Sequence, residues 1–299
     1  MRTILPILGL FGTELVYASP FTTKKDTHYY HLSVGQTTAD DLAKKNSEDE
    51  NRGKWEDSDF TIVHNAFQLK WSRGLSEKSD FTVGVTYKSI KNNGKWGPQQ
   101  SDDSFSGWSD FSFEYKRMVF NKRPYFVALL SSYEGPGSNY NPNKLVTPGN
   151  AVPVYSLGLN SAWLSASNEF MLGLNLAQAF RAGDRAKDQS KYYAYFYYMS
   201  KPGISFGAFF GGVQTQGGID IGSPEWASMV PGESGNGHDG GNYGMPFARL
   251  NEAYRYAGAS LSYSHLQSTV SLSYTQKLLD GAKNTDINSS VALTLGYRT

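Results

Sequence analysis

Five histidines could act as general bases, namely His28, His31, His64, His238 and His265. Of these, His265 has serines close by, because Ser264 precedes it and Ser268 follows it. Acyl transfer of the serine-hydrolase type needs such a pair and an orienting polar group within hydrogen-bond reach. The cluster falls in an expected short turn, at the opposite end of the molecule from the expected long loops. We therefore assign no catalytic residue.

Paired acids could also act as general acid and base, and two adjacent pairs occur, Asp40-Asp41 and Asp102-Asp103. Adjacent residues on an extended chain point in opposite directions, and no histidine accompanies either pair in sequence. Both pairs are interpreted as parts of solvated loops.

A glycine-rich segment, residues 215–250, contains nine glycines and could hold a cation through Asn236, Asp239 and carbonyl oxygens. It lacks the regular alternation of acidic ligands that makes a calcium loop specific. We expect a flexible outer loop, with a loop folded inward to constrict a pore as the alternative. No metal and no cofactor are expected.

Composition narrows the class of protein. The 28 Lys and Arg residues against 27 Asp and Glu residues give a net charge of +1, which offers nothing to attract nucleic acid. Aromatic residues reach 14%, yet mean hydropathy is −0.47. This combination suits a membrane β-barrel, in which only alternate strand residues meet lipid and aromatic side chains gather at both interfaces. The absence of cysteine excludes disulfides and thiolate metal sites.

The N-terminal segment has the pattern of a secretory signal. Arg2 precedes an apolar stretch over residues 4–11, and Val16-Tyr17-Ala18 offers a cleavage site before Ser19. Glu14 leaves the stretch too short to span a membrane. We predict a signal peptide at residues 1–18 and one domain at residues 19–299, with a buried N-terminal element as the alternative.

The rest of the chain alternates apolar and polar residues in segments of about ten residues, the length that a tilted strand needs to cross hydrocarbon. We expect strands at residues 27–36, 58–73, 80–90, 108–119, 125–134, 152–164, 169–180, 190–199, 204–214, 251–264, 268–278 and 287–298.

The expected connections between these strands alternate in length. The short connections are residues 74–79, 121–124, 165–168, 201–203 and 265–267. The long connections are residues 37–57, 91–107, 135–151, 181–189, 215–250 and 279–286. Short periplasmic turns and long extracellular loops are typical of an outer-membrane barrel, whereas a soluble sandwich has no reason to sort its loops by length. The sequence therefore predicts an all-β fold, an antiparallel transmembrane β-barrel of about 12 strands. A secreted β-sandwich is the alternative.

Alternation also predicts which side chains face inward. In residues 287–298, for example, Val291 and Leu293 alternate with Ala292 and Thr294. The apolar set should face lipid and the small or polar set the lumen. Residues 192–198 are aromatic on both faces, so one row of rings belongs either to an interfacial girdle or to a ring-lined track in the lumen.

The same register gives a predicted pore lining of His31, His64, Gln68, Lys70, Lys88, Glu114, Lys116, Asn160, Asn175, Lys277 and Arg298. In hydrocarbon these groups would cost several kcal/mol each, and a water-filled interior removes that cost. Lysines outnumber glutamates among them, which favours anionic or neutral polar solutes. The alternative is a closed barrel filled by its own side chains.

Two segments carry a resemblance to a known family. Residues 107–116, Gly-Trp-Ser-Asp-Phe-Ser-Phe-Glu-Tyr-Lys, and the C-terminal residues 281–285 and 289–298 resemble the outer-membrane family labelled for the MetA pathway of phenol degradation. The resemblance extends from about residue 58 to the end. It implies a membrane barrel with a role in uptake of small molecules, aromatic compounds among them, and it carries no catalytic residues. The chain departs from outer-membrane barrels in ending at Thr299, where an aromatic residue is usual, and Tyr297 could substitute.

The sequence thus predicts a non-enzymatic channel or porin for passive uptake of small solutes in the outer membrane of a Gram-negative bacterium. Its expected partners are outer-membrane lipid, the solutes and the barrel assembly machinery. A barrel whose surface loops bind a partner is the first alternative, and an outer-membrane hydrolase is the second.

Overall fold

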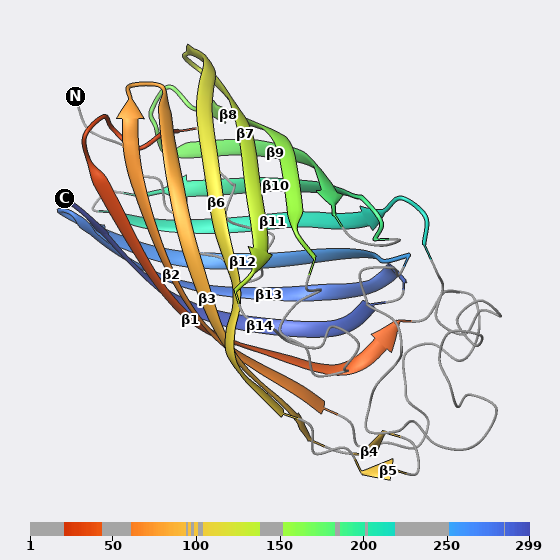
Figure 1. The fold of residues 1–299 in the computed structure, drawn as a ribbon. Coiled ribbons are helices and arrows are strands. Elements are labelled where there is room, and N and C mark those ends of the chain that lie inside the picture. The colour runs from red at the N-terminus through yellow and green to blue at the C-terminus, as the bar shows by residue number, and fades with distance from the viewer. Residues whose placement is uncertain are drawn as a thin grey trace.

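The computed structural model describes residues 21–43, 61–93, 95–96, 99–100, 104–137, 152–182, 186–200, 203–218, 251–283 and 285–299. Among these residues, twelve antiparallel strands close into a barrel (Figure 1). The barrel strands are β1 (His28–Ala43), β2 (Thr61–Ser76), β3 (Ser79–Asn93), β6 (Ser104–Lys122), β7 (Tyr125–Pro136), β8 (Val154–Leu164), β9 (Phe170–Arg181), β10 (Gln189–Met199), β11 (Ile204–Thr215), β12 (Ala253–His265), β13 (Ser268–Lys283) and β14 (Thr285–Arg298). A separate hairpin joins β4 (Lys95–Trp96) to β5 (Gln99–Gln100).

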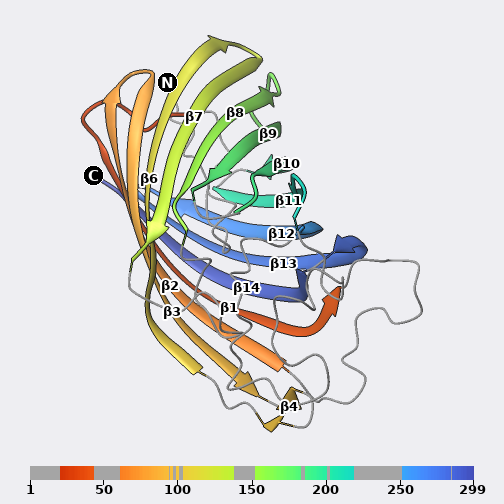
Figure 2. The same cartoon turned by 45° about the vertical axis from the view of Figure 1, so that its right-hand side comes forward.

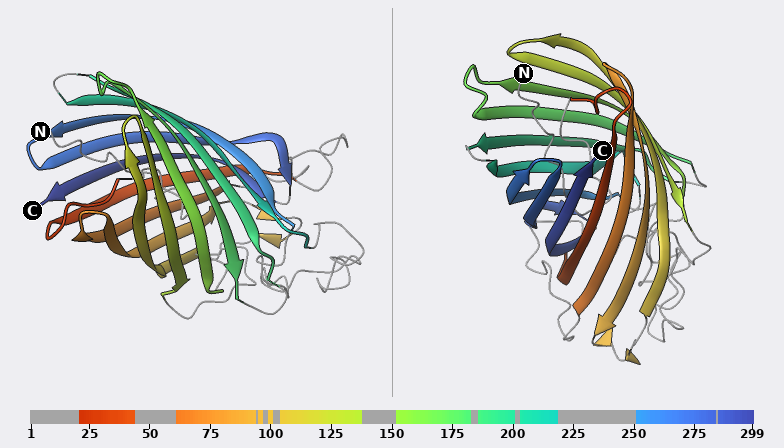
Figure 3. Two further views of the ribbon diagram at one scale, coloured as in Figure 1. Left: turned by 90° about the horizontal axis from the view of Figure 1, so that it is seen from above. Right: turned by 90° about the vertical axis from the view of Figure 1, so that its left-hand side faces the viewer.

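Strands that follow one another in the chain are neighbours in the barrel, and β14 returns to pair with β1. The closing register aligns Tyr29 with Arg298 and Leu32 with Leu295. Views from two further sides show the strands tilted around a continuous wall (Figure 3). The β4–β5 hairpin lies at the end of the barrel opposite the C-terminus (Figure 2). In the part of the chain that the structure describes, no helix is long and apolar enough to cross a membrane.

The outer face of the barrel is apolar along every strand. Leu157 is 60% exposed, and Val291, Leu293 and Leu295 on β14 are 41–50% exposed while the alternate residues of that strand are buried. An apolar band that surrounds the whole molecule is far larger than the isolated patches a water-soluble surface tolerates. The alternation is therefore that of a transmembrane barrel, with its apolar side chains toward lipid.

Each of the twelve predicted strands is present, and the predicted fold is confirmed. The predicted ends are less accurate, because several strands continue beyond the apolar band. The expected long connection at residues 279–286 is wrong, since β13 runs to Lys283 and β14 starts at Thr285. Asp40 and Asp41 also lie within β1 and not in a loop. The signal peptide prediction lies outside the described residues.

Candidate pore

The inner wall carries the polar side chains that the alternation in the sequence predicted to face the lumen. Cross-strand partners share a face, and the pairs His31–Lys70, Asn160–Asn175 and Tyr256–Lys277 lie opposite one another on adjacent strands. All the predicted lining residues, His31, His64, Gln68, Lys70, Lys88, Glu114, Lys116, Asn160, Asn175, Lys277 and Arg298, alternate with outward residues of the lipid face. Their participation in solute passage stays a prediction.

Several of these side chains are buried inside the barrel. Lys70, Glu114 and Lys116 are 7–9% exposed, and Asn160 is 1% exposed. Because buried charges are costly unless other polar groups surround them, this level of the barrel is a dense polar network.

Charges of both signs line β2, β3, β6 and β7. The sequence prediction missed three carboxylates on these strands, Asp80, Asp110 and Glu134, although strict alternation from Thr82, Ser112 and Ser132 reaches each of them. Asp110 forms an ion pair with Lys88, with Nζ and Oδ2 3.9 Å apart. Since these carboxylates offset the lysines, the inference of an anion preference from excess lysine loses its basis.

Aromatic side chains line the opposite wall. Tyr193, Tyr195 and Tyr197 of β10 point inward and are 4–5% exposed, which decides between the two alternatives for this aromatic run. Phe209 of β11 and Tyr254 and Tyr256 of β12 belong to the same cluster. In the order of the twelve strands, β10, β11 and β12 are each six places from β2, β3 and β6. The charged wall and the aromatic wall therefore face each other across the lumen.

Glycines on neighbouring strands receive these rings. A Cβ on Gly211 would meet the Tyr256 ring at 2.4 Å, and one on Gly258 would meet the Phe209 ring at 2.2 Å. Each ring thus occupies the space where a side chain of the adjacent strand would stand. This arrangement keeps the rings against the wall and preserves space in the lumen.

Hydroxyl groups form the part of the wall that includes the β1–β14 junction. Ser33 and Thr294 lie 2.8 Å apart between their oxygens, and Ser271 donates to Ser262 at 2.8 Å. Such pairs satisfy their own hydrogen-bonding capacity and present small, uncharged side chains to the lumen.

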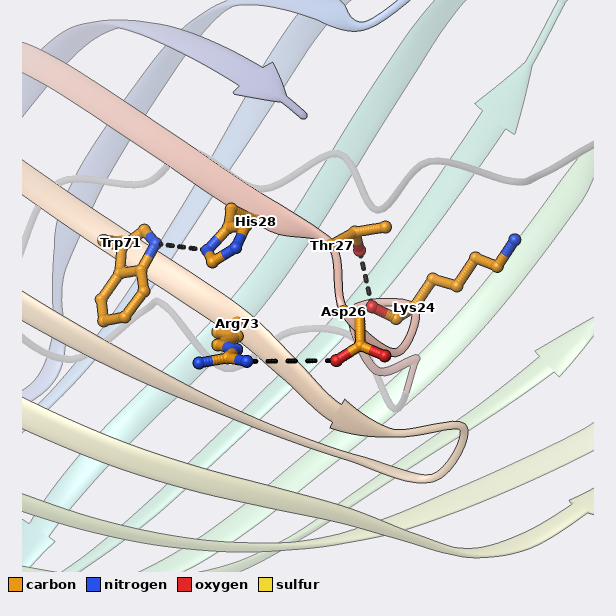
Figure 4. A network of polar contacts seen from close by, with 6 residues as sticks. All are labelled: Lys24, Asp26, Thr27, His28, Trp71 and Arg73. Carbon is orange, nitrogen blue, oxygen red and sulfur yellow. Dashed lines mark hydrogen bonds and ion pairs between the residues drawn. The ribbon is translucent and has the colours of Figure 1, made fainter.

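The N-terminal residues cross the inner surface at the end with the short turns. Figure 4 shows Lys24, Asp26 and Thr27 of this segment near His28, Trp71 and Arg73. Lys25 pairs with Gly74 of β2, and the backbone N–H of Thr23 donates to the buried Asp80. The Phe21 ring packs on Phe126 of β7 with centroids 4.8 Å apart. The segment therefore reaches from Asp80 on the charged wall to the apolar side chain of Phe126, and it narrows this mouth of the barrel.

Contacts at the edge of the mouth hold the start of β1. Trp71 Nε1 donates to His28 Nδ1 at 3.1 Å, and Thr27 Oγ1 donates to the carbonyl of Lys24 at 2.6 Å. Arg73 and Asp26 form an exposed ion pair at 4.0 Å, an interaction that contributes little because solvent screens it.

The hydrolase candidates are not brought together as a catalytic group. The Ser264 hydroxyl pairs with Thr269 at 3.1 Å, while the His265 ring stacks on outward-facing Tyr263. The other candidates, Asp102-Asp103, Asn236, His238 and Asp239, lie outside the described residues. Within the described ranges, no three His, Cys, Asp or Glu side chains are grouped as metal ligands.

No protein-family model matches the chain, and no curated protein sequence matches it. Solved structures match its fold. The COG4313 outer membrane channel from Pseudomonas putida F1 superposes with a TM-score of 0.69 at 10% sequence identity, covering 94% of this chain and 98% of that chain. The NanC porin superposes with a TM-score of 0.51 at 10% identity, covering 89% of this chain and 98% of that chain. At this identity the likeness shows the fold, that of an outer-membrane β-barrel.

Proposed function

We propose that the protein is a passive outer-membrane channel for small solutes and has no enzymatic activity. The observation that carries this proposal is the opposition of an apolar outer band and an inner wall rich in charged, amide and hydroxyl groups, from Lys70 and Glu114 to Asn160 and Ser271. A wall of this kind is stable in a membrane because the barrel keeps its polar groups away from hydrocarbon, in contact with one another and with water in the lumen.

The test is conductance of the purified protein in planar lipid bilayers, together with swelling of protein-containing liposomes in isotonic solutes. Stepwise ion conductance and faster swelling in small solutes are expected. A folded protein that gives neither conductance nor swelling would overturn the proposal and favour a barrel whose loops bind a partner.

The resemblance to the MetA-pathway family and the aromatic inner wall support aromatic compounds among the solutes. Tyr193, Tyr195 and Tyr256 offer rings on which such compounds could pack. Liposome swelling with simple aromatics beside sugars of similar size tests this part of the proposal. Equal rates for both would remove the aromatic preference.

Location and export belong to the same proposal. The predicted signal peptide at residues 1–18 would direct the chain across the inner membrane, and the barrel assembly machinery would then insert residues 19–299 into the outer membrane of a Gram-negative bacterium. Fractionation of expressing cells, with N-terminal sequencing of the membrane-bound product, tests both statements. A mature N-terminus at Ser19 is expected.

A further inference from the structure

Two recesses in the inner wall meet at one residue, Glu134 of β7. The first has a volume of about 410 Å³, part of it open to solvent, and is lined by polar side chains that include Lys70, Asp110 and Glu114. The second has a volume of about 570 Å³, part of it open to solvent, and Glu134 lines it as well. Both recesses open on one side to solvent, so a ligand bound there can extend beyond them. Glu134 therefore lies between the two recesses, which together line the inner wall from β2 to β12.

The first recess presents both signs of charge within one small volume. Lys70 is 9% exposed, and the carboxylates of Glu114 and Glu134 are close enough to interact with it electrostatically. A simple anion beside Lys70 would meet repulsion from both carboxylates, and a simple cation would pair with the carboxylates but offer nothing to the lysine. A ligand with an ammonium and a carboxylate on one atom can pair with both signs at once.

The second recess offers an apolar side to the same ligand. Leu130 and Val154 lie on one flank, and Val213, Tyr193 and Tyr256 lie on the other. The ring of Tyr256 is held against the wall over Gly211, so it leaves the recess open to a ligand side chain. Apolar and aromatic groups bind to such a surface by burial and by ring packing.

We propose that the joined recesses form a selectivity site for zwitterionic amino acids with an apolar or aromatic side chain. The ammonium and carboxylate groups occupy the recess of Lys70, Glu114 and Glu134. The side chain extends past Glu134 toward Tyr193 and Tyr256. This inference rests on the proposed channel function and names the solute class that the channel favours.

Five probe solutes separate the contributions of charge and ring. L-phenylalanine carries both charges and a ring, glycine carries both charges alone, and benzyl alcohol carries a ring alone. 3-Phenylpropanoate and 2-phenylethylamine carry the ring with one charge each. The readout is the concentration at which each solute blocks half of the ion current through a single channel in a planar bilayer. L-phenylalanine is expected to block at the lowest concentration.

Substitutions in the two recesses then test which residues contact the charged groups of the solute and which contact its ring. Glu134→Gln removes a charge at almost unchanged volume, and it is expected to raise the half-blocking concentration of L-phenylalanine by about tenfold, the effect of one lost charge-assisted hydrogen bond. It should leave the half-blocking concentration of benzyl alcohol unchanged. Tyr256→Ser should raise the half-blocking concentrations of L-phenylalanine and benzyl alcohol and leave that of glycine unchanged. Glu77→Gln, in an exposed turn, is the matched control and should change none of them.

The outcomes distinguish this site from the channel itself. Equal blocking by all five solutes, or an unchanged response in Glu134→Gln, would overturn the site while ion conductance still supports a channel. Strongest block by 3-phenylpropanoate would assign an anion site, and strongest block by benzyl alcohol a neutral aromatic site; either result overturns the proposal. A folded barrel without any ion current contradicts the channel function instead. Folding of each variant is checked independently of conductance, by its β-sheet signal in far-ultraviolet circular dichroism.

Discussion

The ring of Tyr195 in β10 lies over Gly173 in β9, so closely that a Cβ on residue 173 would stand 1.9 Å from the ring carbon Cζ. The two residues are also direct cross-strand partners. A separation of this kind leaves no room for any side chain at residue 173. The glycine therefore determines that the tyrosine ring lies along the wall and not across the lumen.

Gly173→Ala should push the Tyr195 ring into the lumen and destabilise the barrel by about 1–3 kcal/mol, the usual cost of overpacking. Unfolding in urea from lipid vesicles measures the stability, and single-channel recordings should show a lower conductance. Tyr195→Ala should relieve the clash, so the double variant should lose less stability than the two single changes together. Gly137→Ala is the control, because its nearest neighbours are at an ordinary 3.5 Å. Equal losses at residues 137 and 173 would contradict the argument.

The ion pair between Lys88 and Asp110 should affect ion selectivity in opposite directions when each partner is neutralised. Lys88→Met leaves a net negative charge on the wall and should shift the reversal potential in a salt gradient toward cation preference. Asp110→Asn should shift it toward anion preference. The double variant should return near the original value, because the charges cancel. Measurements at low salt are most sensitive, since screening is weak there. Shifts of the same sign in both single variants would refute this prediction.

The N-terminal segment should limit ion flow through the mouth with the short turns. Phe21→Ser removes the packing on Phe126, and Gly74→Ala would place a Cβ 2.0 Å from the carbonyl oxygen of Lys24. Both changes should release the segment and raise single-channel conductance. Lys25→Met, at an exposed side chain of the same segment, should not. Unchanged conductance in both variants would show that the mouth is not the narrow point.

The turn between β12 and β13 contains a leucine in an unfavourable backbone conformation. Leu266 has a φ of 50° and is 79% exposed. The left-handed region costs a non-glycine residue about 1–2 kcal/mol, and glycine avoids that cost. Leu266→Gly should therefore stabilise the barrel by about 1 kcal/mol, measured by urea unfolding in vesicles. Leu75→Gly, another exposed leucine near a short turn but within β2, should destabilise it. Loss of stability in Leu266→Gly would contradict the argument.

The fold could be predicted from local patterns because the alternation of side chains within each strand indicates which of its faces meets lipid. Alternation such as Val291, Leu293 and Leu295 needs no knowledge of other strands. The ends of strands were harder to predict, because the hydrogen-bonded ladder of β13 continues to Lys283, past the region where lipid imposes alternation. Backbone pairing persists there without a period-two signal.

The inner wall could be predicted only in part. Lys70, Glu114 and Asn160 follow from alternation within single strands. The direction of Tyr193, Tyr195 and Tyr197 does not, because β10 is aromatic on both faces. That choice depends on glycines of other strands, such as Gly173 and Gly207, which receive the rings only in one register. The joining of two recesses at Glu134 likewise requires the order of strands around the barrel.

The pairing of β1 with β14 closes the wall by joining the two barrel strands that lie farthest apart in sequence. Tyr29 pairs with Arg298, so the seam forms only after both residues and the chain between them have been synthesised. Until then β1 and β14 each present unpaired backbone N–H and C=O groups, which hydrocarbon cannot hydrogen-bond. Contacts between residues so far apart in sequence form slowly. The chain must therefore be kept from aggregating between its synthesis and its final closure.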